Sequence, residues 1–97
     1  DTIGFALLQC MLAQKLGVIA GVYTHTISNA HIYENHYAGA EEIITRTNDH
    51  KNITLHLPEN AFDRAEKKDE AIVEEIFTDL QSQYNPLPPI TGLEIAL

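Results

Sequence analysis

The segment from Ile3 to Leu16 constrains the fold of this 97-residue chain most strongly, because its apolar side chains occupy more than one face of a helix. Two apolar rows run along it at helical spacing: Ile3, Leu7 and Met11, and Phe5, Leu8 and Leu12. A helix with several apolar faces is normally buried nearly all round. Gly17 suits the position just past its end, where a left-handed backbone is common. We therefore expect a central, buried helix.

Several other segments favour extended backbone. Val18–Thr26 is rich in β-branched and aromatic residues, which predicts a strand. Ile27–Tyr33 is expected to stay extended. Ile53–Leu57 alternates apolar and polar side chains, and Pro58 ends that predicted strand. Residues 93–97 alternate in the same way.

Two further helices complete the expected elements. Asn35 is a suitable N-cap for a helix that continues to about Arg46. Asp69–Gln81 carries an amphipathic stripe, with an acidic run from Glu66 to Glu75 that predicts a solvated helix face. Strands and helices together predict an α+β fold in which a sheet packs against buried helices. We find no domain boundary.

The acidic balance of the chain excludes one class of function. Fourteen acidic and six basic side chains give a formal net charge of −8. General nucleic-acid binding needs a basic face that neutralises phosphates, so we expect no nucleic-acid partner. A single phosphorylated ligand is compatible with this charge.

The cysteine count and the apolar runs indicate a compartment. Cys10 is the single cysteine and cannot form an internal disulfide, which is typical of an intracellular, cytoplasmic protein. No apolar run approaches the ~20 residues that span a bilayer, so we expect no membrane association. The sequence opens on Asp1 with no leader pattern, and we expect part of the fold to precede it.

The stretch from Thr24 to His36 concentrates hydrogen-bonding side chains ahead of a predicted helix. In an extended segment, Asn29, His31 and Tyr33 share one face. A ring nitrogen and a phenol two positions apart can both reach one ligand atom, and both suit a sugar hydroxyl. His31 and Tyr33 are therefore the candidate ligand-binding pair.

A metal site is not expected in this stretch. His25, His31 and His36 lie in it, but no cysteine or carboxylate cluster accompanies them. The predicted secondary structure also changes between these histidines. Structural and catalytic zinc sites group three or four ligands closely, which this pattern does not achieve.

These motifs resemble the thymidylate synthase family. Ala6-Leu7-Leu8 and Met11-Leu12-Ala13-Gln14 resemble its long buried helix, and His31-Ile32-Tyr33-Glu34-Asn35-His36 resembles its strand-to-helix signature. Residues 58–63, 84–86 and 95–97 resemble later parts of the family, less closely, and residues 64–76 look longer than usual. The resemblance implies that residues 1–97 are the C-terminal portion of a single two-layer domain, in an enzyme that forms a homodimer through its sheets.

The resemblance also implies ligands. His31 and Tyr33 would hydrogen-bond the 3′-hydroxyl of a pyrimidine deoxynucleotide, deoxyuridylate (dUMP). Ala96 and Leu97, with Tyr33, would contact the folate cosubstrate 5,10-methylenetetrahydrofolate, because the family's C-terminal residues close over it. Such closure excludes water from a reaction. The family transfers the one-carbon unit of this folate to C5 of the pyrimidine, forming dTMP, after a cysteine thiolate adds to C6.

The family's nucleophile and phosphate-binding arginines lie on the N-terminal side of this stretch. Cys10 does not match the nucleophile, since it falls within the helix that the family buries, and it is expected to be a small core residue. The chain is therefore expected to hold no catalytic residue and to be inactive alone.

Two departures from the family leave alternatives open. Asp1 stands where the family has an Asn that reads uracil, and a carboxyl group suits the amino group of cytosine better. This favours a deoxycytidylate (or deoxyuridylate) hydroxymethylase as the second hypothesis. Asn29 replaces a usual Asp. A third hypothesis is a non-catalytic nucleotide-binding or assembly module built on the same fold.

Overall fold

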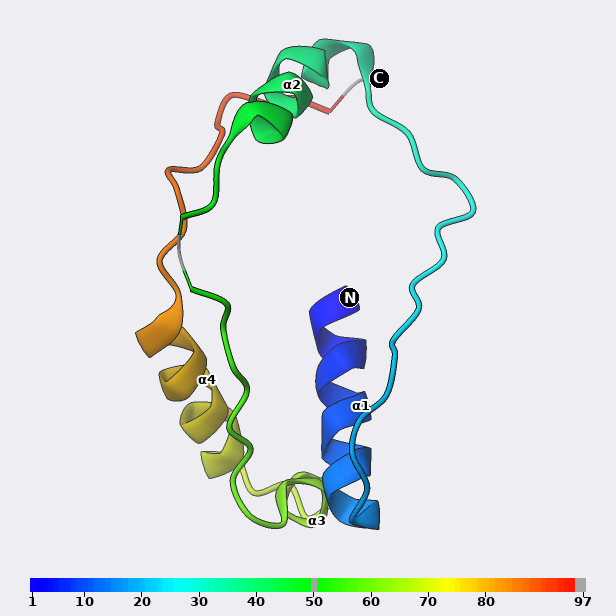
Figure 1. The fold of residues 1–97 in the computed structure, drawn as a ribbon, viewed down its shortest axis with the longest axis vertical. Helices are drawn as coiled ribbons and strands as arrows, with labels where there is room; N and C mark the ends of the chain where they lie inside the picture. Colours follow the sequence, from blue (N-terminus) through cyan, green and yellow to red (C-terminus); the bar gives the residue numbers. More distant parts are fainter. Residues whose placement is uncertain (50, 96–97) are drawn as a thin grey trace. The chain divides into compact units, whose positions relative to one another are not determined.

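The computed structural model describes residues 1–49 and 51–95 of the chain. They form two compact units, each made of two stretches of sequence (Figure 1). The first unit contains Asp1–Thr26 and Ile53–Tyr84, and the second contains Ile27–Asn52 and Asn85–Leu97.

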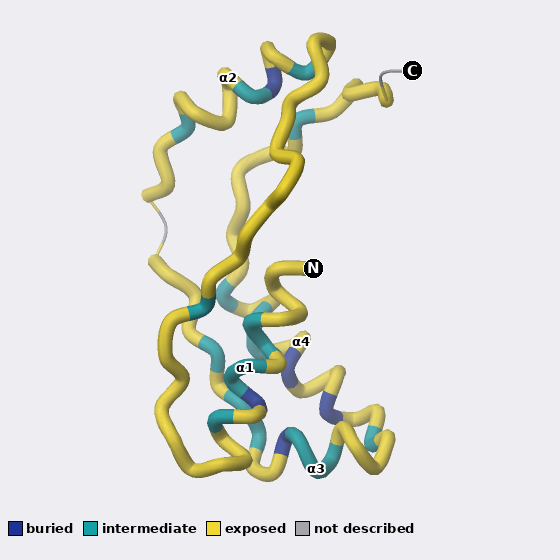
Figure 2. The backbone as a smooth tube through the Cα atoms, turned by 90° about the vertical axis from the view of Figure 1, so that its right-hand side faces the viewer, coloured by how far each residue is buried: buried dark blue, intermediate teal, exposed yellow. Residues whose placement is uncertain are grey.

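Three helices build the first unit: α1 (Thr2–Leu16), α3 (Ala61–Glu66) and α4 (Ala71–Gln83). The short helix α3 contacts both of the longer ones. The buried positions of the unit lie where these helices meet (Figure 2). They are Met11, Ala61, Ile72 and Ile76, with Leu7, Leu55, Leu57, Phe62 and Leu80 packed around them.

Polar side chains join α3 to α1. The amide of Gln14 donates to the carbonyl of Pro58 at 2.9 Å and accepts from the backbone N–H of Ala61 at 3.1 Å. The second bond satisfies one of the backbone donors that the first turn of a helix leaves without a partner. Lys15 and Asp63 form an ion pair beside it. Gln14 thus serves as a cap supplied from another helix.

Arg64 ties α3 to α4. Its guanidinium binds Asp69 at 2.8 Å and Glu75 at 2.6 Å. The hydrogen bond from Arg64, with one from the backbone of Ala71, holds the pKa of Asp69 below its ordinary value of 3.8. Part of the acidic run from Glu66 to Glu75, predicted as a solvated helix face, is therefore paired with Arg64. The run also includes the residues between the end of α3 and the start of α4.

The lowered pKa of Asp69 predicts a pH-dependent contribution to stability. A carboxyl group whose pKa is lower in the folded state stabilises the fold at pH values above 3.8, and this contribution is lost as the pH falls through the folded pKa. Asp69→Asn should therefore lower the free energy of unfolding at neutral pH, with the deficit shrinking towards pH 2. Denaturant titrations from pH 2 to 7 measure it, with Glu59→Gln, an exposed turn residue, as the control. A deficit that is independent of pH would contradict the pairing.

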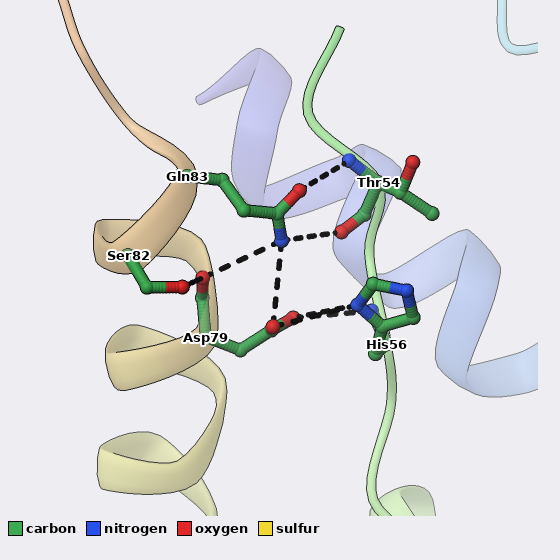
Figure 3. A network of polar contacts seen from close by, with 5 residues as sticks. All are labelled: Thr54, His56, Asp79, Ser82 and Gln83. Atoms are coloured by element: carbon green, nitrogen blue, oxygen red, sulfur yellow. Dashed lines mark hydrogen bonds and ion pairs between the residues drawn. The ribbon is translucent and has the colours of Figure 1, made fainter. Parts of the chain in front are cut away.

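The expected α+β fold is wrong for the described residues, which contain helices and no strand. A strand needs a neighbour about 4.8 Å away to pair its backbone groups. Around Ile53–Leu57, side chains of α4 take that place (Figure 3). Gln83 accepts from the Thr54 N–H at 2.9 Å and donates to the Thr54 carbonyl at 2.8 Å. These are the groups through which Thr54 would join a ladder.

His56, two residues after Thr54, is held in the same way. Asp79 accepts from the backbone N–H of His56 at 3.3 Å, and its carboxylate also lies 3.3 Å from the Nδ1 atom of that histidine (Figure 3). In the other predicted strand, Val18–Thr26, the side chain of Gln9 donates to the carbonyl of Gly21 at 3.2 Å. Side chains of helices α4 and α1 therefore replace strand partners at these positions.

The helix predictions are largely confirmed. The segments predicted over Ile3–Leu16 and Asp69–Gln81 are α1 and α4, and Gly17 has the left-handed backbone expected of it, with φ of 67°. The prediction that this helix is buried nearly all round is wrong, because Met11 is the one buried residue of α1 and Ile3 is 80% exposed.

The second unit contains a 3-10 turn, η1 (Glu34–His36), followed directly by α2 (Tyr37–Thr45). The predicted helix over these residues exists, but Asn35 lies inside η1 and is not its N-cap. Gly39 of α2 is buried (Figure 2). A Cβ atom on Gly39 would stand 3.4 Å from Leu93 and 3.5 Å from Ile90. The residues before the C-terminus therefore pack closely against α2.

Candidate functional site

His31 and Tyr33 lie side by side ahead of η1. Their ring centroids are 5.4 Å apart, with the ring planes at 57°. The predicted extended course is interrupted by a turn at residues 28–29. This turn brings the carbonyl of Asn29 to 2.8 Å from the Nδ1 atom of His31. A carbonyl only accepts, so Nδ1 carries the hydrogen, and the Nε2 atom of the neutral ring is an acceptor.

Tyr33 is flanked by a second imidazole. The ring of His36 lies edge-on, with its centroid 5.4 Å from that of Tyr33, and the His36 backbone N–H donates to the Tyr33 carbonyl at 2.9 Å. Tyr33 is 38% exposed, so part of this residue is accessible to a ligand. The phenol can donate to, or accept from, a hydroxyl group.

The side chains after Tyr33 hold the C-terminal part of the chain. Asn35 donates to the carbonyl of Glu94 at 2.9 Å through Nδ2. The Nε2 atom of His36 lies 2.6 Å from the same oxygen and must be its donor. We call this arrangement the Glu94 clamp. It was not predicted from the sequence, because Asn35 and His36 stand 59 and 58 positions before Glu94 and no local pattern links residues so far apart.

The other predicted site residues lie in the other unit or outside the described residues. Asp1 is the N-cap of α1, where its carbonyl accepts from the Phe5 N–H at 3.0 Å while its exposed side chain makes no capping hydrogen bond. It belongs to the first unit, whereas His31 and Tyr33 belong to the second. Ala96 and Leu97 lie outside the described residues. Cys10 is a half-buried free thiol within α1.

Two other polar features lie in the first unit. A pocket between α1 and α3 is lined by Gln14, Lys15, Asn60, Phe62 and Asp63, and two of these residues, Lys15 and Asp63, form an ion pair. The side chains of His56 and Asp79 form the second feature. Within residues 1–49 and 51–95, no three histidine, cysteine, aspartate or glutamate side chains gather as a metal would require. No helix in those ranges is long and apolar enough to cross a membrane.

A comparison with protein families places these features in context. The family model described as thymidylate synthase matches residues 1–93. This match covers nearly the whole chain, including the helix α1, the His31–Tyr33 pair and the two donors of the clamp, Asn35 and His36, and it ends one residue before Glu94. The chain belongs to the thymidylate synthase family.

A curated relative agrees. The chain is similar to a protein named thymidylate synthase from Clostridium beijerinckii, with 47% identity over 49 residues. That stretch is 50% of this chain and 19% of the relative, so the chain matches about a fifth of the length of that protein. No solved structure matches the chain.

Proposed function

We propose that the protein to which this chain belongs is a thymidylate synthase, which transfers the one-carbon unit of 5,10-methylenetetrahydrofolate to C5 of deoxyuridylate and forms dTMP. The juxtaposition of His31 and Tyr33, with ring centroids 5.4 Å apart, carries the proposal. Membership of the family and the name of the curated relative support it. The same comparisons do not favour the hydroxymethylase or the non-catalytic module.

In this proposal the chain recognises the sugar of the nucleotide. The Nε2 atom of His31 accepts a hydrogen bond from the 3′-hydroxyl, because Asn29 holds the hydrogen of the ring on Nδ1. The phenol of Tyr33 donates to the same oxygen. A hydroxyl group offers one donor and two acceptor positions, so it can satisfy both side chains at once. The acidic chain contributes no phosphate site, and the arginines for the phosphate belong elsewhere in the protein.

The other parts of the proposal concern the whole protein. Tyr33, Ala96 and Leu97 contact the folate cosubstrate, and two copies form a homodimer in the cytoplasm. Residues 1–97 make up the C-terminal portion of one domain, and no metal takes part. Cys10 sits in α1 as a half-buried thiol and does not serve as the nucleophile. The chain alone is therefore inactive.

Turnover by the full-length protein tests the function. It should convert deoxyuridylate to dTMP in the presence of 5,10-methylenetetrahydrofolate, with product followed by chromatography. Conversion of deoxycytidylate to its hydroxymethyl derivative in place of this reaction would establish the hydroxymethylase instead. Nucleotide binding with no turnover of either substrate would leave the non-catalytic module.

Base selection by Asp1 can be tested separately. An amide at this position can donate to one edge atom of uracil and accept from another, whereas a carboxylate only accepts. Asp1→Asn should shift kcat/KM towards deoxyuridylate over deoxycytidylate by about tenfold, as expected for one hydrogen bond. Glu70→Gln is a matched control, because Glu70 is the N-cap of α4 and also makes no capping hydrogen bond. An unchanged ratio in Asp1→Asn would remove Asp1 from base recognition.

A further inference from the structure

The Glu94 clamp joins two segments that are far apart in sequence. Asn35 and His36 lie in η1, directly after Tyr33, while Glu94 lies near the C-terminus. A carbonyl oxygen has two lone pairs, and these two donors occupy both. The clamp therefore fixes the Glu94 carbonyl against η1 in direction as well as in distance.

Apolar contacts seat the same segment. Leu93 and Ile90 approach the backbone of α2 at Gly39, where the side-chain atoms stand within 3.4–3.5 Å of a Cβ position that glycine leaves empty. The segment from Ile90 to Glu94 is thus held at one end by contact with α2 and at the other by hydrogen bonds to η1. Both anchors lie in the second unit, together with His31 and Tyr33.

His36 links the clamp to the ligand-binding pair. Its ring stands edge-on to that of Tyr33, and its Nε2 atom is the donor to Glu94. Donation through Nε2 fixes the orientation of this imidazole, and the ring contact passes that orientation to Tyr33. A shift of the Glu94 carbonyl would therefore either break its hydrogen bond with His36 or turn the His36 ring that contacts Tyr33.

We propose that Asn35 and His36 are positioning residues, whose shared hydrogen bonds to the Glu94 carbonyl set the C-terminal segment in register with Tyr33 and so determine how tightly the folate cosubstrate binds. This inference rests on the proposed function, in which residues just after Glu94 contact the folate. It assigns no chemical step to either side chain. Their effect is to keep the segment ordered before the ligand arrives, which lowers the ordering cost of binding.

Substitutions in the full-length protein separate the clamp from simple packing. Asn35→Asp removes the donor while keeping the shape, and His36→Phe keeps the ring beside Tyr33 but cannot donate. His36→Gln keeps an N–H donor and should restore much of the effect. Gly39→Val disrupts the other anchor, the apolar contact with α2, because the valine side chain would displace Leu93 and Ile90.

Two readouts are needed. Amide hydrogen exchange at residues 93–95, without ligand, should rise about tenfold in Asn35→Asp and in His36→Phe. The dissociation constant for the folate, measured in the presence of deoxyuridylate, should rise about five- to tenfold, as expected for one lost hydrogen bond. The dissociation constant for deoxyuridylate alone should stay within twofold in Asn35→Asp, since Asn35 binds the Glu94 carbonyl and stands outside the His31–Tyr33 pair. The rise in folate dissociation constant should be smaller in His36→Gln than in His36→Phe.

The outcomes distinguish the two proposals. A wild-type protein that turns over no nucleotide overturns the proposed function, whatever the variants do. An active wild type whose variants exchange faster but bind folate normally overturns the positioning role. Unchanged exchange in both Asn35→Asp and His36→Phe overturns the clamp itself. Faster exchange with weakened folate binding, partly restored by His36→Gln, supports the inference.

Discussion

Replacing Ile72 by alanine should lower the free energy of unfolding by about 2–5 kcal/mol. Ile72 is 4% exposed and belongs to the small buried cluster with Met11, Ala61 and Ile76. Truncation removes apolar surface from that cluster and leaves a cavity that its neighbours fill only in part. Ala61, which is fully buried on α3, has no longer side chain with which to fill the space.

Denaturant unfolding of the full-length protein measures this loss. The control is Val73→Ala, because Val73 is the next residue of α4 and is 67% exposed. Its truncation should change the free energy by no more than about 0.5 kcal/mol, as is usual for surface positions. Equal effects of the two substitutions would show that α4 does not pack through Ile72. The contrast therefore tests which face of α4 is inside.

The helices could be predicted because their signals are local. Apolar spacing places α1 and α4 to within two residues at each end, since side chains three and four apart share one helical face whatever surrounds them. The helix α3 was missed because it spans only Ala61–Glu66, too short for a periodic pattern. Its start depends on Gln14, which caps it from α1 across 47 positions.

The strands could not be predicted in the same way. Residues such as Ile19 and Val22 favour extended backbone, but a strand exists only when a second segment pairs with it. In the described residues these two side chains are 96% and 92% exposed, and no ladder forms. At Thr54 the amide of Gln83 occupies both backbone groups. Strand propensity thus indicated which residues adopt extended backbone, but not which groups their backbone N–H and carbonyl groups bind.

The candidate site also has a part that the local sequence predicts and a part that it does not. His31 and Tyr33 are two positions apart, and their proximity follows from the local chain. The clamp depends on Glu94 returning to Asn35 and His36, which no short-range pattern encodes. The choice of tautomer at His31 also needed the structure, because it depends on the turn at residues 28–29.

The second large effect is expected at the sugar-binding pair. His31→Ala and Tyr33→Phe should each weaken binding of deoxyuridylate by about 1–3 kcal/mol, because each loses one hydrogen bond to the 3′-hydroxyl. That corresponds to roughly 5- to 150-fold in the dissociation constant, measured by calorimetry. Tyr37→Phe is the control, since Tyr37 is an exposed tyrosine at the start of α2. It should bind the nucleotide normally.

A nucleotide without the 3′-hydroxyl gives the decisive comparison. The 2′,3′-dideoxy analogue of deoxyuridylate should bind the wild type more weakly than deoxyuridylate does, by a factor at least as large as that of Tyr33→Phe, because it loses its hydrogen bonds to both His31 and Tyr33. It should then bind Tyr33→Phe and the wild type about equally, because the hydroxyl removed from the ligand is the one that the phenol would have met. Additive losses from the two changes would mean that Tyr33 contacts another part of the nucleotide. Non-additive losses at both His31 and Tyr33 would locate the hydroxyl between an acceptor fixed by Asn29 and a donor held beside His36.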